Sequence, residues 1–270
     1  MLSLISTPIG NLDDISLRAI DVIKSADFIY TEDTRSFKKI LDSIECKKKC
    51  KSFHEHNEDI ICKEIIKHLK NKKHVILTCE AGTPAISDPG YKLIRECLNL
   101  NLKYTLIPGP SSLINAVVLS GLPTDKFSFY GFIPKKNNAQ KKLFQKVSND
   151  EKTAIMFESV KRLRKTIISI SNHLDNNRHI SVCREMTKIH EQIVQGNCED
   201  LLKKIDCGSL PLKGEIVLVI EGNTTNNINI KLDNKVKDAF LDKLSISDAA
   251  KLLSLVCLLY TSDAADDWSG

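Results

Sequence analysis

Short apolar runs alternate with amphipathic segments along the first half of the chain. The run HVILTC, residues 74–79, is continuously apolar, as is typical of a strand buried on both faces. In the segment before it, NEDIICKEIIKHLK, apolar residues recur every three or four positions, as in an amphipathic helix. The alternation continues as far as PSSLINAVVLSG, residues 110–121. This order of elements predicts a parallel β-sheet with helices on its faces.

The alternation resumes after a basic connection, FIPKKNNAQKK. It continues through TAIMFES, a helix, HISVCRE, a second helix CEDLLKKID and the strand GEIVLVIEG. A change of composition near residues 125–150 marks the best domain boundary. The pattern therefore predicts two α/β domains, residues 1–122 and 123–230.

The last forty residues are expected to be of two kinds. Residues 231–256 read as a truncated C-terminal helical segment, beyond which the natural C-terminus is expected to be missing. Residues 257–270 begin with CLLYTSDAADD, which resembles the translation of a sequencing adapter. They are excluded from the prediction of the fold as a scar.

Composition limits the class of protein. With 42% hydrophobic and 27% charged residues among 270, the chain is not disordered as a whole. A net charge of +5 is too small by itself to indicate nucleic-acid binding. Nine cysteines without a CxxC pair, and no secretory leader, indicate reduced thiols. Since no apolar run reaches about 18 residues, we expect a cytoplasmic protein without a membrane span.

The stretch EAGTPAISDPG, residues 80–90, follows a predicted strand and has few large side chains. Loops at the carboxyl ends of parallel strands hold ligands in open α/β sheets. Gly82 would let a ligand approach the backbone, and Pro84 and Pro89 would keep main-chain groups aimed. Asp88 is predicted to cap the next helix, with Pro89 at its first position.

Two other loops have the same character: STPIGNLDD after the first strand and IPGPSS, residues 107–112. We expect the three to converge at one sheet edge. The chain has neither the GxGxxG fingerprint of dinucleotide-binding folds nor the GxxxxGK[ST] phosphate loop. NAD and ATP are therefore disfavoured, while a nucleoside cofactor without phosphates remains possible.

Nine motifs, in order, resemble those of the ribosomal RNA small subunit methyltransferase I family, part of the tetrapyrrole-methylase-like group. They are STPIGNLDDISLRA, ADFIYTEDTR, HEHNE, AGTPAISDPG, PGPSSL, LPTDKFSFYGFIPKK, FESVKRL, CREMTK and GEIVLVIEG. The resemblance runs from residue 2 to about residue 222.

The resemblance implies two α/β domains of tetrapyrrole-methylase type, with S-adenosyl-L-methionine in the interdomain cleft. It implies 2′-O-methylation of a cytidine ribose in the decoding region of small-subunit ribosomal RNA, free or in the 30S particle, by a homodimer. The cofactor-binding residues that it suggests are Ile9, Gly82, Thr83, Ile86, Ser111, Ser112, Met156 and Met186. Packing in the core is the alternative for Ile86 and the two methionines.

A ribose hydroxyl must lose its proton to attack a methyl group, so a base or a stabilising cation should lie nearby. No metal is required. The preferred catalytic candidates are Asp33, Arg35, Glu158 and Lys188, chosen from a set that also holds Glu32, Glu55, Arg184 and Glu185. Asp33 and Arg35 could instead form a structural ion pair, and Arg184 and Lys188 a solvated helix face.

Two basic stretches, Lys135–Lys142 and Lys161–Lys165, suit contacts with RNA phosphates, although charge runs are commonly solvated surface. The aromatic residues of FSFYGF, Phe127–Phe132, could stack on bases or belong to the core. A less favoured alternative is a zinc site formed by Cys46, Cys50, His54 and His56.

The chain departs from the family pattern at two places. Cys79-Glu80 stands where the family usually has Ser-Asp, and Val160-Lys161 stands where Pro-His is common. The first change puts cofactor affinity in doubt, and the second prevents the transfer of any role of that histidine. Two other functions stay open: a methylase of a small tetrapyrrole-like substrate and a catalytically silent RNA-binding homologue.

Overall fold

The computed structural model describes residues 1–224, 242, 245 and 248. Residues Met1–Gly222 form one compact unit. The predicted adapter scar at 257–270 lies outside the described residues. Of the predicted helical segment at 231–256, only positions 242, 245 and 248 are described. The predicted domain boundary at residues 122 and 123 stays a prediction.

The first sheet contains five parallel strands in the order β3-β2-β4-β1-β5. Its strands are β1 (Leu2–Ile5), β2 (Phe28–Thr31), β3 (Cys50–Ser52), β4 (Val75–Thr78) and β5 (Tyr104–Ile107). The predicted parallel sheet is confirmed. Because the strands are parallel, the loops that follow β1, β4 and β5 leave the same edge of the sheet.

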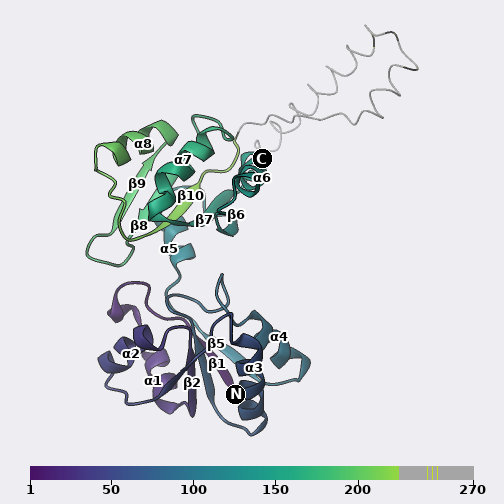
Figure 1. Cartoon of the computed structure of the whole chain (residues 1–270), viewed down its shortest axis with the longest axis vertical. Coiled ribbons are helices and arrows are strands. Elements are labelled where there is room, and N and C mark those ends of the chain that lie inside the picture. The colour runs from purple at the N-terminus through teal and green to yellow at the C-terminus, as the bar shows by residue number, and fades with distance from the viewer. Residues whose placement is uncertain (225–241, 243–244, 246–247, 249–270) are drawn as a thin grey trace, which may run out of the picture. The chain divides into compact units, whose positions relative to one another are not determined.

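Helices cover both faces of the first sheet (Figure 1). On one face lie α1 (Leu17–Ser25) and α2 (Thr34–Ser43), whose buried side chains pack with Ile5, Ile29 and Ile76. On the other lie α3 (Glu58–Lys70) and α4 (Tyr91–Asn99), which pack with strand residues of the opposite phase such as Tyr30. Burial on both faces explains why the strands read as continuous apolar runs.

The second sheet has the order β6-β7-β10-β8-β9. Its strands are β6 (Phe127–Phe132), β7 (Thr153–Ser159), β8 (Ile180–Arg184), β9 (Gln192–Gly196) and β10 (Glu215–Ile220). Only β6 and β7 pair in parallel; β10 is antiparallel to both of its neighbours, and β8 pairs antiparallel with β9. The alternation of strands and helices therefore did not reveal the strand direction in this half.

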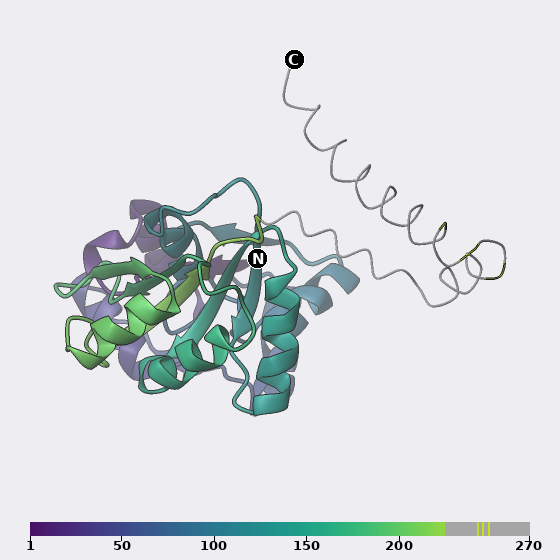
Figure 2. The same cartoon turned by 90° about the horizontal axis from the view of Figure 1, so that it is seen from above.

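The two faces of the second sheet are covered by different parts of the chain. Three helices, α6 (Asn137–Ser148), α7 (Leu163–Ser171) and α8 (Cys198–Asp206), pack on one face (Figure 1; Figure 2). The other face receives α5 (Ser112–Leu119), through Leu113, Ala116 and Val117, together with Ile9. The helix α5, which follows β5 of the first sheet, thus packs on the second sheet. We call the part of the chain that forms the first sheet the first half and the part that forms the second sheet the second half.

Two short 3-10 helices, η1 (Leu12–Asp14) and η2 (Val160–Arg162), complete the elements. None of the helices within the described residues is long and apolar enough to span a bilayer. The eight cysteines in the described part of the chain are all free thiols.

Candidate functional site

The three loops predicted to converge do so through direct contacts. Thr7 and Gly82 form an isolated antiparallel bridge, with N–H to O=C distances of 2.9 and 3.0 Å. The Thr83 hydroxyl lies 3.1 Å from that of Ser6 and donates to the Pro110 carbonyl at 3.3 Å. Gly82 has a φ of +83°, which favours glycine at this bridge. The loops after β1, β4 and β5 therefore form one surface, built largely from main-chain groups.

This surface is one side of an open cleft of about 1300 Å³. The other side comes from the second sheet and its loops, through Phe157, Ile216 and Val217 among others. Seven of the eight residues predicted to bind the cofactor line the cleft: Ile9, Gly82, Thr83, Ile86, Ser111, Ser112 and Met186. The mixture of apolar and polar lining is typical of a small-molecule site, and the volume is above the roughly 300–1,000 Å³ that such sites usually have.

Met156 is the exception. It is fully buried among side chains from α6, α7 and α8 and does not line the cleft. Successive strand residues point to opposite faces, so its neighbour Phe157 reaches the cleft instead. The strand was predicted correctly but not its phase, and the packing alternative holds for Met156.

Three carboxylates gather at the cleft edge of the first sheet: Glu32 after β2, and Glu80 and Asp88 after β4. We call them the acidic edge; all three line the cleft. Burial, reinforced by the charge of Glu32, raises the pKa of Asp88 to about 6. Burial also raises the pKa of Glu32. Glu32 and Asp88 can therefore hold a proton closer to neutral pH than ordinary carboxylates do.

Asp88 does not cap the next helix, so that prediction is wrong. The helix α4 begins at Tyr91, and its N-cap is Gly90. The Gly90 N–H donates instead to the carboxylate of Glu58, on α3, at 3.0 Å. The first turn of α4 therefore has no side-chain cap, and Asp88 lines the cleft instead.

Asp33 and Arg35 do not line the cleft. The Asp33 carboxylate is the N-cap of α2 and accepts from the main-chain N–H groups of Arg35 at 2.7 Å and Ser36 at 3.4 Å. Arg35 is exposed. The pair acts through helix capping, which favours a structural role for the EDTR motif, with Glu32 as its residue in the cleft.

Glu158 lines the cleft but is fixed by its neighbours. Its carboxylate accepts from Arg162 Nε at 2.9 Å and Nη2 at 2.7 Å, from Thr166 Oγ1 at 2.6 Å and from the Ser159 N–H at 2.6 Å. The side chain is 2% exposed. A carboxylate that already accepts four hydrogen bonds is a poor candidate for a proton acceptor.

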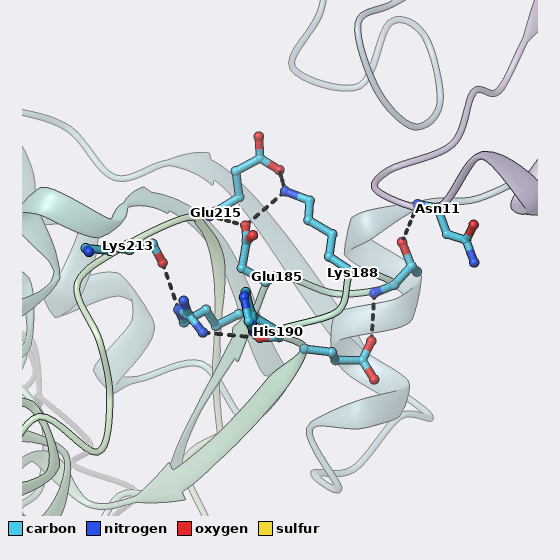
Figure 3. Close-up of polar contacts among 9 residues, drawn as sticks. Asn11, Glu185, Lys188, His190, Lys213 and Glu215 are labelled. Carbon is cyan, nitrogen blue, oxygen red and sulfur yellow. Dashed lines mark hydrogen bonds and ion pairs between the residues drawn. The ribbon is translucent and has the colours of Figure 1, made fainter. Parts of the chain in front are cut away.

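Lys188 lies in a tight turn after β8 and lines the cleft. Figure 3 shows its ammonium between Glu185 and Glu215, each 2.9 Å away. Burial lowers the pKa of Lys188, but these two hydrogen bonds outweigh it and raise the pKa overall. Lys188 is therefore a charged group neutralised by two carboxylates.

The same turn contacts the first loop. The Asn11 N–H donates to the Thr187 hydroxyl at 3.1 Å (Figure 3). A Cβ added to Gly10 would lie 2.5 Å from Lys188 Cγ, so only glycine allows this approach. A loop of the first half is therefore seated on a turn of the second at the side of the cleft.

Arg184 and Glu185 also differ from a solvated helix face. Arg184 is the last residue of β8 and is buried, and it donates to the carbonyls of Lys213 at 2.7 Å and His190 at 3.2 Å. Glu185 is held by Lys188 and by the Glu215 N–H. Neither lines the cleft, and nor does Glu55.

The remaining candidates are the zinc site, the aromatic residues of β6 and the two basic stretches. Within the described residues, no three His, Cys, Asp or Glu side chains are placed to share a metal ion, so the zinc alternative has no geometric support. Phe129 and Phe132 both pack edge-on against Phe157, at 4.9 and 5.2 Å, but Phe132 is 65% exposed and also lines the cleft. Lys135 and Lys161 line the cleft, and the other lysines of their stretches do not.

Sequence reasoning missed Asp88 and Phe157 as cleft residues. Asp88 lies in the AGTPAISDPG motif, where the pattern Asp-Pro-Gly predicts a helix cap, and Phe157 is the residue after Met156 in β7. No local signal separates these outcomes, because strand phase and capping partners depend on contacts distant in sequence.

The chain is similar to known proteins over most of its length. The family model described as Tetrapyrrole (Corrin/Porphyrin) Methylases matches residues 1–202. A cobalt precorrin-4 methyltransferase, a cobalamin biosynthetic enzyme, has a similar structure, with a TM-score of 0.58 and 14% identity, covering 82% of this chain and 94% of that one. At this identity the likeness concerns the fold alone, and it confirms the predicted fold class.

Closer relatives share the name ribosomal RNA small subunit methyltransferase I. The protein of Rickettsia prowazekii is 40% identical over 245 residues, which cover 90% of this chain and 86% of the relative. That of Halalkalibacterium halodurans is 38% identical over 222 residues, covering 82% and 76%. The chain therefore belongs to the ribosomal RNA small subunit methyltransferase I family, within the tetrapyrrole methylases.

Proposed function

We propose that the protein transfers a methyl group from S-adenosyl-L-methionine to the 2′-hydroxyl of a cytidine ribose in the decoding region of small-subunit ribosomal RNA. Family membership supports methyl transfer, and the names of the relatives support ribosomal RNA as the substrate. The observation that carries the proposal is the cleft itself, where three main-chain loops face cationic side chains of the second half.

The residues of the cleft fit this cofactor chemically. Apolar side chains such as Ile9, Met186 and Phe157 suit a flat adenine ring, while Ser111, Ser112 and main-chain groups suit polar substituents. The acidic edge suits a ligand with positive charge. When bound, S-adenosyl-L-methionine supplies an electrophilic methyl group on a cationic sulfur.

The chain must orient the ribose hydroxyl and accept its proton. Asp33 caps a helix, Glu158 is saturated with hydrogen bonds, and Lys188 is paired with two carboxylates. We therefore propose that a carboxylate of the acidic edge, Glu32 or Asp88, accepts the proton. A base whose pKa approaches the working pH is best suited to this step.

The experiment is methyl transfer from labelled cofactor to small ribosomal subunits, followed by mapping of the modified nucleotide. Label on one cytidine ribose of the decoding region supports the proposal. Label on a porphyrinoid and none on RNA would favour a small-molecule methylase. Cofactor and RNA binding without transfer to any acceptor would favour the catalytically silent homologue.

We also propose that the protein is a homodimer. The outward side of α5 carries exposed apolar residues, among them Ile114 at 46% and Val118 at 64% exposure, and the helix has no charged residue. An apolar helix face of this kind suits burial against a second copy. Sedimentation should show a dimer, and Val118→Glu should shift it toward monomer; a monomeric native protein would refute the proposal.

A further inference from the structure

Three cations of the second half belong to the lining of the cleft, and we call them the basic rim: Lys135, Lys161 and Arg162. Lys135 follows β6, and the other two belong to η2, directly after β7. All three line the cleft. Lys135 and Lys161 are exposed, whereas Arg162 is partly buried.

Arg162 is held rigidly. Its Nε and Nη2 donate to the two oxygens of Glu158 at 2.9 and 2.7 Å, and Nη2 also donates to the Ile133 carbonyl at 2.6 Å. Among the hydrogen bonds of the described residues, Nη1 takes no part. A guanidinium whose orientation is already fixed loses little entropy when it binds an anion through its remaining donors.

The same contacts hold the basic rim together. Ile133 lies two residues before Lys135, and its N–H donates to the Phe157 carbonyl at 3.0 Å. Arg162 and β7 therefore fix the chain that leads to Lys135, while Lys161 adjoins Arg162 directly. Lys135, Lys161 and Arg162 are thus kept at one side of the cleft. Because Glu158 offsets the charge of Arg162, the positive charge of the basic rim comes mainly from Lys135 and Lys161, which form no ion pair among the described residues.

The charge on the opposite side differs. The acidic edge, Glu32, Glu80 and Asp88, comes from the first half, which contributes one basic residue to the lining, Lys39 of α2. Lys188 is neutralised by Glu185 and Glu215. An anionic ligand is therefore favoured at the basic rim and disfavoured at the acidic edge.

We propose that the basic rim is a subsite for a phosphodiester of single-stranded RNA adjacent to the nucleotide that enters the cleft. The inference rests on the proposed function, since it concerns the same substrate. Lysine and arginine contacts to phosphate position an RNA strand without reading its sequence. Phe132, exposed at the same cleft, is placed to contact a neighbouring base.

The test compares two double variants with the same change of charge. Lys135→Ala with Lys161→Ala removes two members of the basic rim. Lys141→Ala with Lys165→Ala removes two exposed lysines from the same basic stretches that do not line the cleft. Each pair is assayed for steady-state methylation of small subunits, for affinity to a single-stranded decoding-region oligonucleotide over a range of salt, and for cofactor affinity by calorimetry.

The cleft pair should raise KM for the RNA substrate about tenfold or more and lower the salt slope of log affinity by about 1.4, since each single-strand phosphate contact contributes about 0.7. Cofactor affinity should stay within about twofold. The control pair should change KM and the salt slope by less than half as much. Equal effects of both pairs would overturn the subsite and leave only a general attraction of RNA to positive charge.

Failure of the subsite and failure of the proposed function give different results. If the wild-type protein methylates RNA but the cleft pair behaves like the control pair, only the subsite is wrong. If the wild-type protein binds cofactor yet methylates no RNA, the proposed function and the subsite that rests on it both fail. As a further check, Arg162→Lys should raise KM more than it lowers kcat, because lysine keeps the charge but not the fixed fork.

Discussion

Replacement of Glu158 by alanine tests whether this carboxylate supports the fold or takes part in proton transfer. The side chain is 2% exposed and its partner Arg162 is 26% exposed. Removal of one member of a buried ion pair costs about 3–5 kcal/mol, because the other charge is left without compensation. Since Arg162 can be partly hydrated, we expect a loss near the lower end, about 3 kcal/mol.

A loss of this size is measurable in a protein of ordinary stability, about 5–15 kcal/mol. In a chain of this length it should lower the apparent Tm by roughly 6–12 °C. Thr166→Val, which removes one of the four hydrogen bonds, should cost about 1.5–3 kcal/mol. Thermal and urea unfolding of both variants, beside the wild type, provide the measurement.

Glu158→Gln separates support of the fold from proton transfer. The amide keeps the shape but cannot satisfy all four donors, so we expect a lower Tm, a raised KM for RNA through a looser Arg162, and a kcat within about tenfold of wild type. Loss of a general base lowers the rate by about 10²–10⁴-fold. A variant with an unchanged Tm and a kcat reduced by more than a hundredfold would refute the structural assignment.

Three other substitutions test the cleft. Asp88→Asn should stabilise the protein by about 1–2 kcal/mol at pH 7.5, after allowance for partial exposure, but not at pH 4. Burial raises the pKa of Asp88 to about 6, so the cost of ionising it in the folded state develops as the pH rises from about 4 to 6. Equal shifts of the urea midpoint at both pH values would contradict this. Gly10→Ala should weaken cofactor binding, measured by calorimetry, at least about tenfold. The new Cβ would lie 2.5 Å from Lys188 Cγ and 3.0 Å from the Met186 carbonyl oxygen, and would push the first loop away from the turn after β8. Unchanged affinity would show that this contact does not shape the cofactor site. Met156→Ala should lower the free energy of unfolding in urea by about 2–5 kcal/mol, because the side chain belongs to the core, while cofactor affinity stays within about twofold. A loss of cofactor affinity without a loss of stability would show that Met156 belongs to the cofactor site.

The convergence of the loops could be predicted because it depends on local composition. Glycine and proline after β1, β4 and β5 indicate main-chain sites wherever strands are parallel, and the Thr7 to Gly82 bridge confirms the meeting of two of these loops. Side-chain roles could not be predicted in the same way. Met156 and Phe157 differ by one residue in a strand, and that step exchanges core for cleft.

Tertiary partners explain the other failures. The N-cap of α4 is Gly90, whose N–H donates to Glu58 on α3, and no pattern around Asp88 reveals this contact. The antiparallel direction of β10 is hidden as well, because a central strand buried on both faces reads as a continuous apolar run in either direction. In each case the sequence specified the element correctly, and a contact distant along the chain decided its role.

Charge gives the clearest case of information that only the fold supplies. A net charge of +5 spread over 39 basic and 34 acidic residues says almost nothing about RNA. The fold separates these charges: carboxylates that follow β2 and β4 form the acidic edge, and cations that follow β6 and β7 form the basic rim. A cationic methyl donor and a polyanionic acceptor therefore have different preferred sides of one cleft. Glu80→Lys raises the net charge and Lys161→Glu lowers it, yet we expect both to reduce the rate of RNA methylation, because each places the wrong charge on its side of the cleft. If Glu80→Lys increased the rate, only the net charge would matter.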